Sequence, residues 1–493
     1  MPADNVTERI KAKALVNKLA SGDEAASIIQ KAAKIGISGN IPALDEAIIK
    51  NAKEGTDFAL TVWSGAVGLP ADIMLGGAGV IARRIGQQSL LRKSINEGKV
   101  AYSDLSLGSL YQTMRAGELG VLDIAIVTAT AITEDGNIIP SLVVADMPNF
   151  VDMAAKIIVG IDMCCPPEIE GLHDIFLPKN PPHRGNIPIY KTSDRIGTKY
   201  IPLDASKISH IIPVQGGISF PKQQADDISI KIGKNVVKFL QDQVAGGWLP
   251  SNLLPIEIGV GGASAAILDE LVTSNFDNLE FYAAIVGDGI LNLIDRRKVK
   301  AASGTALMLS DENLKKFLND IESYKEYIVL RPLEISDSPE VAARLGIIAI
   351  NGAIEVDIYG FANCTHIAGG RVINGIGGLG DFASNSFISI VMLPSVAKNG
   401  AISGVVPMVS HVSLTEHNVD IVVTEQGVAD LRGLCPLEKA EIIIQQCSHP
   451  YYRPLLMDYF TRASQKLGGH QPHLLDEALS FHQRLFTKGT MKV

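Results

Sequence analysis

Apolar runs of strand length alternate with segments of helical spacing along most of the chain. The strand-like runs are 57–65, 123–132, 255–262, 327–335, 347–350 and 419–424. The helical spacings are 71–84, 152–159, 263–273 and 340–346, the last preceded by Ser338 and Pro339 as a cap and first-turn proline. This alternation predicts an α/β fold with largely parallel sheets.

The domain organisation follows from the length and from one irregular segment. At 493 residues the chain is too long for a single ordinary domain. Residues 178–203 are rich in proline and polar residues, and they predict a long surface connection. We therefore expect two α/β domains of similar size, 1–225 and 226–493, with a cleft between them.

Composition and charge narrow the classes of function. The net charge of −9 disfavours a nucleic-acid partner, which would select a basic face. No run of 18 apolar residues predicts a membrane span, and the first 19 residues lack the apolar core of a signal peptide. Five cysteines without a CxxC pair predict neither a disulfide framework nor a zinc site. We expect a cytoplasmic protein that holds no metal, although an organellar matrix stays open.

Two glycine-rich segments are candidates for contact with a ligand. Gly259, Val260, Gly261, Gly262 and Ala263 follow a predicted strand and open a helix, where backbone N–H groups can approach an anion. A tight turn without a ligand explains the same residues. The segment 374–382 holds four glycines in six positions, and it is either a loop pressed against a ligand or a flexible surface loop.

Two strand ends carry acidic residues. Glu425 follows the strand at 419–424, and Gly427 is expected to turn the chain toward a helix. Because ligands bind at the carboxyl ends of strands in open α/β sheets, Glu425 is a candidate site residue, with a helix-capping carboxylate as the alternative. Asp288, after the apolar run at 281–286, is expected to be a turn residue.

Several segments together resemble the acetyl-CoA hydrolase/transferase family, most closely its succinyl-CoA:acetate type of CoA-transferase. The resemblance is strong over 255–485 and looser over the first half. The segments that carry it are VDIYGFANCTH (356–366), VINGIGGLGDFASNS (372–386), AKNGAISGVVPMVSHV (397–412), VVTEQGVADLRG (422–433), YYRPLLMDYFTRA (451–463) and PHLLDEALSFH (472–482).

The resemblance implies two CoA-transferase-type α/β domains with the active site in the cleft between them. It also implies a reaction in which an enzyme glutamate attacks an acyl-CoA thioester and passes through a glutamyl-CoA thioester to an incoming carboxylate. Coenzyme A and small carboxylates are then the expected ligands, and a homodimer is the expected assembly.

The family motifs assign roles to residues of this chain. Gly259 to Ala263 match a loop that contacts coenzyme A, and Lys398 matches a further coenzyme A contact. Asn374 and Gly378 match the glycine-loop positions, with the Gly378 N–H as a candidate oxyanion donor. Glu425 matches a second active-site glutamate that positions the carboxylate substrate or a water.

One position departs from the family. Where relatives carry the nucleophilic glutamate, this chain has Ala284, and a methyl group cannot form an anhydride. Either a glutamate was replaced deliberately to trap a coenzyme A complex, which the intact remaining motifs favour, or the chain is a natural non-catalytic relative. Asp288 and Glu280 are not positioned in the sequence to replace the missing carboxylate.

The sequence is compatible with three functions. The first is CoA transfer between a succinyl-, acetyl- or propionyl-CoA and a carboxylate, disabled by Ala284. The second is acyl-CoA hydrolysis directed by Glu425, and the third is non-catalytic binding of coenzyme A. Trp63 either reshapes the acyl pocket or packs in the core, so the acyl group stays open.

Overall fold

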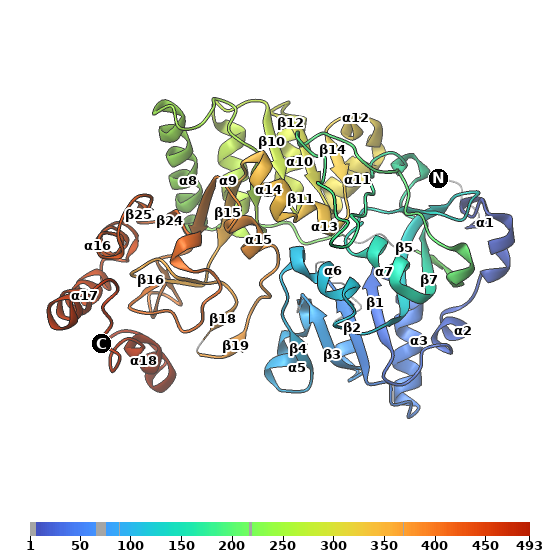
Figure 1. Cartoon of the computed structure of the whole chain (residues 1–493), viewed down its shortest axis with the longest axis horizontal. Helices are drawn as coiled ribbons and strands as arrows, with labels where there is room; N and C mark the ends of the chain where they lie inside the picture. Colours follow the sequence, from blue (N-terminus) through green and yellow to red (C-terminus); the bar gives the residue numbers. More distant parts are fainter. Residues whose placement is uncertain (1–5, 66–74, 88, 216–218, 368) are drawn as a thin grey trace. The chain divides into compact units, whose positions relative to one another are not determined.

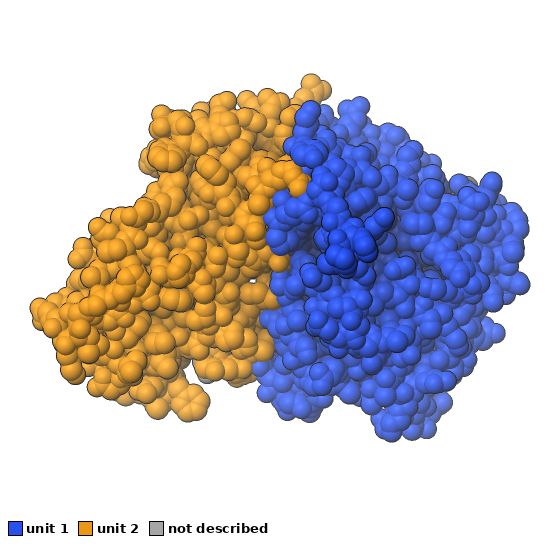
Figure 2. Space-filling model, in the orientation of Figure 1, with its two compact units in different colours: residues 1–222, 283–288, 301–341 blue, residues 223–282, 289–300, 342–493 orange. Residues whose placement is uncertain are grey.

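The chain folds into two compact units. The computed structural model describes residues 6–65, 75–87, 89–215, 219–367 and 369–493 (Figure 1). Unit 1 comprises residues 1–222, 283–288 and 301–341, and unit 2 comprises residues 223–282, 289–300 and 342–493 (Figure 2). Neither unit is one continuous segment. The domain boundary expected near residue 225 stays a prediction.

Unit 1 is built on a largely parallel sheet with the strand order β4-β3-β2-β1-β5-β7-β8, and β6 pairs antiparallel with β5. The strands are β1 (Lys34–Ser38), β2 (Leu60–Ser64), β3 (Ile81–Gly86), β4 (Ala101–Ser103), β5 (Leu122–Ile132), β6 (Ile138–Pro140), β7 (Ala154–Asp162) and β8 (Ile208–Val214).

Helices cover both faces of this sheet, as the alternation of side chains along β1 shows. Ile35 and Ile37 belong to a buried cluster that includes residues of α2 and α3. Gly36 points to the other face, where the Phe150 ring of α7 lies 2.7 Å from the position that a Cβ would take. The α-helices of this region are α1 (Val6–Arg9), α2 (Gly22–Ala26), α3 (Pro42–Lys53), α5 (Arg92–Asn96), α6 (Leu107–Arg115) and α7 (Met147–Met153).

Later segments of the chain complete unit 1. β11 pairs with β13, and the end of β12 pairs with β14, both in parallel. These elements are β11 (Ile285–Gly287), β12 (Val299–Gly304), β13 (Ala306–Met308), β14 (Ile328–Leu330), α11 (Asp311–Asn319), α12 (Ile321–Lys325), α13 (Leu333–Ser336) and the start of α14 (Pro339–Leu345).

Unit 2 contains the strand order β10-β9-β15-β20-β24-β25, in which only β25 runs antiparallel to its neighbour. The strands are β9 (Ile256–Ile258), β10 (Leu279–Tyr282), β15 (Ile348–Gly352), β20 (Ile388–Met392), β24 (Ile421–Thr424) and β25 (Gly427–Asp430). The helices are α8 (Asp227–Ala245), α9 (Gly262–Thr273), most of α10 (Asp288–Asp295), α15 (Leu379–Ala383), α16 (Pro436–Cys447), α17 (Arg453–Leu467) and α18 (Ser480–Lys488).

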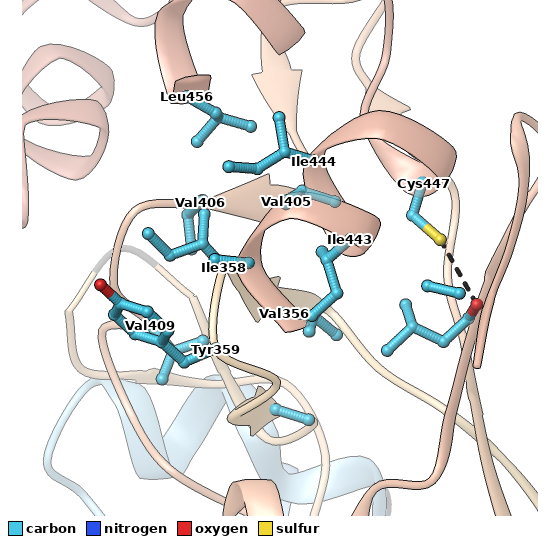
Figure 3. Close-up of a cluster of buried hydrophobic side chains, with 14 of the residues drawn as sticks. Val356, Ile358, Tyr359, Val405, Val406, Val409, Ile443, Ile444, Cys447 and Leu456 are labelled. Carbon is cyan, nitrogen blue, oxygen red and sulfur yellow. Dashed lines mark hydrogen bonds between the residues drawn. The ribbon is translucent and has the colours of Figure 1, made fainter. Parts of the chain in front are cut away.

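Short strand pairs join the larger elements of unit 2. They are β16 (Glu355–Asp357) with β17 (Ala362–Asn363) and β23 (Val405–Val406), β18 (His366–Ile367) with β19 (Arg371–Val372), and β21 (Val396–Ala397) with β22 (Ile402–Ser403). Apolar side chains of β16, β23, α16 and α17 form one buried cluster, in which the Cys447 thiol donates to the Val422 carbonyl (Figure 3).

The predicted α/β class with parallel sheets is confirmed. Most of the predicted elements are present, including the strands β2, β5, β9, β15 and β24 and the helices α9 and α14. Two predicted helices are wrong in large part. Within 71–84, residues 71–74 lie outside the described residues and 81–84 belong to β3, while within 152–159 the strand β7 begins at Ala154. Short apolar runs fit either period, and pairing with β2 and β5 decided for strand.

The irregular segment 178–203 does connect regular elements, but its description as a surface loop is wrong in part. Ile187, Ile189, Thr192 and Ile201 in this segment are fully buried. The segment is held by Arg331, whose guanidinium donates to the backbone carbonyls of Thr192 and Asp194. Backbone carbonyls that satisfy a buried cation explain why this loop enters the interior.

Arg331 is the centre of a buried ion pair in unit 1. Its side chain and that of Asp174 are 0% and 1% exposed, and the two groups form a direct salt bridge. Arg331 also donates to the Ser303 hydroxyl at 2.8 Å, while Asp174 accepts the N–H groups of Ile196 and Gly197 at 2.8 and 2.7 Å. The pair thereby fastens β14 to the segment 178–203.

The described residues show neither a membrane-spanning helix nor a metal-binding cluster. No helix among them is both long and apolar enough to cross a membrane. The same residues contain no group of three or more His, Cys, Asp and Glu side chains arranged to hold a metal ion.

We predict that Arg331→Met destabilises the protein by about 3 to 5 kcal/mol, because it leaves the buried Asp174 carboxylate without its counter-charge. Urea unfolding followed by circular dichroism measures the loss. Lys238→Met is the matched control, since it breaks an ion pair whose side chains are 73% and 60% exposed, and we expect it to change stability by less than about 0.5 kcal/mol. A loss below about 1 kcal/mol for Arg331→Met would contradict this account.

Candidate active site at the carboxyl edge of the unit 2 sheet

Four parallel strands of unit 2 end at the same edge of their sheet. These strands are β9, β15, β20 and β24. Gly259 follows β9, Ser395 follows β20 and Glu425 follows β24. Because parallel strands place their carboxyl ends together, these segments share one edge, where ligands bind in open α/β sheets.

The Glu425 carboxylate is held by hydrogen bonds at this edge. The Ser395 N–H donates to Oε2 at 2.8 Å, and the Ser395 hydroxyl donates to Oε1. The side-chain amide of Gln426 also donates to Oε1, at 3.0 Å. The side chain is half-buried, so the carboxylate keeps one exposed side while the other side is fixed.

These bonds determine the charge state of Glu425. Burial acts to raise the pKa of the carboxyl, but the hydrogen bonds from Ser395 and then from Gln426 outweigh it, and the pKa lies below the usual value. Glu425 is therefore ionised at neutral pH. An ionised and oriented carboxylate can accept a proton from water or hydrogen-bond a second reactant.

Ser395 is itself rigidly placed. Its side chain is fully buried, and its carbonyl accepts the N–H of Gly404 at 2.8 Å. A Cβ at Gly404 would lie 2.2 Å from the Pro394 carbonyl oxygen, so only glycine permits this close approach. Sequence reasoning missed Ser395, because the serine lies 30 positions from Glu425 and belongs to no recognisable motif with it.

The structure corrects the expected course of the chain after Glu425. Gly427 does not lead into a helix but begins β25, which folds back antiparallel on β24. The next helix, α16, begins only at Pro436. Glu425 therefore sits in the turn of a hairpin and does not cap a helix.

The segment Gly259–Ala263 forms the expected strand-to-helix turn. Gly259 donates to the Ile350 carbonyl at 3.2 Å, Gly261 has a φ of +126°, and Gly262 begins α9. A Cβ at Gly262 would lie 2.9 Å from the Gln224 carbonyl oxygen, so close packing alone requires this glycine. Val260 is 63% exposed, which leaves the outer side of the turn open to a ligand.

A buried polar pair that sequence reasoning missed lies beneath this turn. The Asn351 amide of β15 donates to the Glu257 carboxylate of β9 at 2.7 Å, and both side chains are buried. The Asn351 side-chain oxygen lies 3.6 Å from the position of a Cβ on Gly259. Alternation within β9 is the only signal that places Glu257 on the same face as Gly259.

Asn374 and Gly378 lie in the loop before β20. The N–H of Asn374 donates to the Thr365 carbonyl and its side-chain amide donates to the Cys364 carbonyl, both at 3.2 Å. The loop is therefore tied to β17 and β18 and is not a free surface loop. Gly378 is the N-cap of α15, and among the described residues its N–H donates no hydrogen bond, as an oxyanion donor requires.

Lys398 lies in the turn between β21 and β22. Its side chain is exposed, and its φ of +48° is uncommon for a residue with a Cβ. Lys398 comes three residues after Ser395, so the turn lies close in sequence to the residue that binds Glu425.

Ala284 belongs to unit 1, whereas the other predicted site residues belong to unit 2. It links β10 to β11, and its carbonyl accepts the Thr305 N–H at 2.8 Å. The residue is partly exposed. Asp288 does not form a turn as expected: it opens α10 and accepts the Ser310 N–H at 2.9 Å. Trp63 is fully buried in β2, so it packs in the core.

The comparisons with known proteins agree on one family. The acetyl-CoA hydrolase/transferase N-terminal domain matches residues 3–213, and the acetyl-CoA hydrolase/transferase C-terminal domain matches residues 313–460. The chain is 44% identical to the succinyl-CoA:acetate CoA-transferase of Clostridium kluyveri, over 99% of this chain and 93% of that protein. It is 37% identical to the propanoyl-CoA:succinate CoA transferase of Escherichia coli, over 96% and 98% of the two chains.

Hydrolases and solved structures extend the comparison. The acetyl-CoA hydrolase of Saccharomyces cerevisiae is 34% identical over 99% of this chain and 97% of its own length. RipA from Yersinia pestis shares the fold with a TM-score of 0.72 at 20% identity, covering 92% of this chain and 99% of its own. A 4-hydroxybutyrate CoA-transferase from Porphyromonas gingivalis does so with a TM-score of 0.64 at 19% identity, covering 91% and 99%. These two structures support the fold, while the two matching domain models and the relatives at 34% to 44% identity show that the chain is a member of the acetyl-CoA hydrolase/transferase family.

Proposed function

We propose that this chain binds a short-chain acyl-CoA at the carboxyl edge of the unit 2 sheet, on a scaffold that serves CoA transfer to a carboxylate. The observation that carries the proposal is the ionised Glu425 carboxylate, fixed by Ser395 at the edge that also carries the Gly259–Ala263 turn. The relatives named as succinyl-CoA:acetate and propanoyl-CoA:succinate transferases support succinyl, acetyl and propionyl groups as candidates.

In the proposed binding mode, the turn Gly259–Ala263, Asn374 and Lys398 contact coenzyme A. The unoccupied N–H of Gly378 supplies a donor for the negative charge that develops on the thioester oxygen. Glu425 orients the carboxylate substrate or a water through its exposed side. We further propose that the protein works as a homo-oligomer in the cytoplasm and needs no metal.

The covalent route of transfer requires a glutamate that this chain lacks. In that route a carboxylate oxygen attacks the thioester carbonyl, the C–S bond breaks, and an anhydride and the CoA thiolate result. The thiolate then attacks the glutamyl carbonyl, forms a glutamyl thioester and releases the acyl group as a carboxylate. The methyl group of Ala284 offers no oxygen for the first step, so the chain with Ala284 binds its ligand without transferring it by this route.

Hydrolysis is a second candidate, and the geometry of Glu425 is the observation that favours it. An ionised carboxylate can take a proton from water, whose oxygen then attacks the thioester carbonyl and expels the CoA thiolate. The thiolate is finally protonated. The yeast relatives are named acetyl-CoA hydrolases, and hydrolysis by this route does not involve position 284. Non-catalytic binding of coenzyme A is the third candidate, which the loss of the nucleophile favours.

We predict that Ala284→Glu creates CoA-transferase activity that the chain with Ala284 lacks. Succinyl-CoA is incubated with acetate or propionate, and both acyl-CoA species are followed by mass spectrometry. Ala284→Gln is the matched control, because it has the size of glutamate without a nucleophilic oxygen anion, and we expect it to stay inactive. Covalent catalysis is worth several orders of magnitude in rate, so the contrast is easily measured.

The same assay separates the three candidates. Release of free coenzyme A by the Ala284 chain without any acceptor carboxylate would favour hydrolysis. If the Ala284→Glu protein is as inert as its parent while both bind coenzyme A with micromolar affinity, transfer is refuted and non-catalytic binding replaces it. Failure of both proteins to bind coenzyme A would refute the proposal as a whole.

We predict that Ser395→Ala raises the pKa of Glu425, because the hydroxyl donor to Oε1 is lost. The folded-state pKa of Glu425 is depressed, so its contribution to stability is present above the unfolded value and is lost as pH falls through the folded one. The cost of Ser395→Ala in unfolding free energy should therefore be larger at pH 7 than at pH 3. Carbon-13 NMR titration of labelled glutamate carboxyls measures the pKa directly, and an unchanged Glu425 titration would contradict the assignment.

A further inference from the structure

The turn that carries Lys398 has an unusual backbone. Three successive residues lie in the left-handed region, with φ values of +48° at Lys398, +53° at Asn399 and +81° at Gly400. The Ala401 N–H closes the turn on the Lys398 carbonyl at 3.1 Å. A left-handed conformation is unfavourable for a residue with a Cβ, and such strain persists only where the surroundings fix it.

The surroundings that fix this turn come from the segment Thr490–Lys492. The Met491 N–H and the Thr490 hydroxyl both donate to the Ala401 carbonyl, at 2.8 and 3.1 Å. Met491 is 1% exposed, and its sulfur accepts the Ser403 N–H at 3.3 Å. The segment therefore lies along the second strand of the Lys398 hairpin.

One aromatic and one cationic side chain also hold the turn and the segment Thr490–Lys492 in place. The Tyr452 hydroxyl donates to the Gly400 carbonyl at 2.9 Å. The Arg484 guanidinium donates to the Met491 carbonyl at 3.0 Å, which holds the segment from its other side. The turn is therefore held by hydrogen bonds from the segment Thr490–Lys492 and from Tyr452. These contacts explain how its left-handed backbone is maintained.

The segment Thr490–Lys492 also places a second ammonium group beside the turn. The Lys492 Nζ lies 3.5 Å from the position of a Cβ on Gly400, two residues from Lys398. It also lies 5.3 Å from the centre of the Tyr451 ring, which holds the side chain in place by a cation–π contact. Among the described residues, neither Lys398 nor Lys492 forms an ion pair with a carboxylate.

Lys398 lies on this fixed turn and the Lys492 ammonium lies beside it, and within the described part of the chain neither has a carboxylate partner, so the pair can bind an anion. The chain as a whole carries a net charge of −9, so a local surplus of positive charge is not a property of its general surface. Ammonium groups bind phosphate oxygens as point charges, and holding them in place before binding lowers the entropic cost. A purely structural role of residues 490–492 would need the backbone bonds and Met491, but not the ammonium of Lys492.

We propose that Lys492 and Lys398 together form a phosphate-binding subsite for the nucleotide part of coenzyme A. This inference rests on the proposed function, in which Lys398 contacts coenzyme A, and adds Lys492 as a second binding residue. The ligand class is a phosphate ester, either the 3′-phosphate or the diphosphate bridge of coenzyme A. Lys492 acts on affinity and takes no part in the chemistry at the thioester.

The test is the affinity of four proteins for coenzyme A by titration calorimetry: the parent chain, Lys492→Met, Lys492→Arg and Lys488→Met. Lys488 is an exposed residue at the end of α18, so Lys488→Met removes the same charge nearby without touching the turn. We expect Lys492→Met to weaken binding by about 3- to 10-fold, and Lys492→Arg and Lys488→Met to bind like the parent. The difference between Lys492→Met and the parent should shrink at high salt, because phosphate and ammonium are then screened.

Repeating the titration with 3′-dephospho-coenzyme A assigns the phosphate. A difference between parent and Lys492→Met that disappears with this ligand supports contact with the 3′-phosphate, and a difference that persists supports contact with the diphosphate. The inference is overturned if the parent binds coenzyme A and Lys492→Met binds it equally well, or if Lys492→Arg does not restore affinity. If the parent itself does not bind coenzyme A, the proposed function fails and this inference fails with it.

Discussion

In a parallel sheet, the residues that follow neighbouring strands all lie at the same edge. This constraint organises the candidate site in unit 2. β9, β15, β20 and β24 lie side by side in parallel, so segments far apart in the sequence arrive at one edge. This arrangement places Gly259, Ser395 and Glu425 at the shared edge. The lowered pKa of Glu425 depends on that convergence, because the segments after β20 and β24 bring Ser395 to the Glu425 carboxylate.

The proposed chemistry depends on residues of unit 2 that are present and on a glutamate that the chain lacks at position 284. In the proposed function, the Glu425 carboxylate would accept a proton, and the Gly378 N–H, which donates no hydrogen bond within the described residues, would stabilise developing negative charge. The covalent route that the family resemblance implies would need a glutamate at position 284, where this chain has alanine. Family membership therefore describes how the chain folds and which ligand class it suits more directly than it describes which reaction the chain completes.

Much of the fold follows from the sequence, and the failures have physical reasons. The strand of Glu425 is predictable because its residues are β-branched, and the helix after Gly262 is predictable because helical spacing continues over 263–273. The patterns of β3 and β7 also fit a helix, since a short apolar run suits both periods until a neighbouring strand pairs with it. Sequence reasoning missed Ser395 and Asn351, because their partners Glu425 and Glu257 are brought to them by sheet register and not by sequence spacing. The predicted ligand contacts at Asn374 and Lys398 remain predictions.

The buried pair of Arg331 and Asp174 has a consequence for how the chain is made. The two residues are 157 positions apart, and the whole stretch from Gln223 to Tyr282, which belongs to unit 2, is synthesised between them. While the ribosome is still adding that stretch, the growing chain already contains the acidic partner but not the basic one. Unit 1 therefore cannot reach its final packing as soon as its first 222 residues have emerged, and it matures only after part of unit 2 exists.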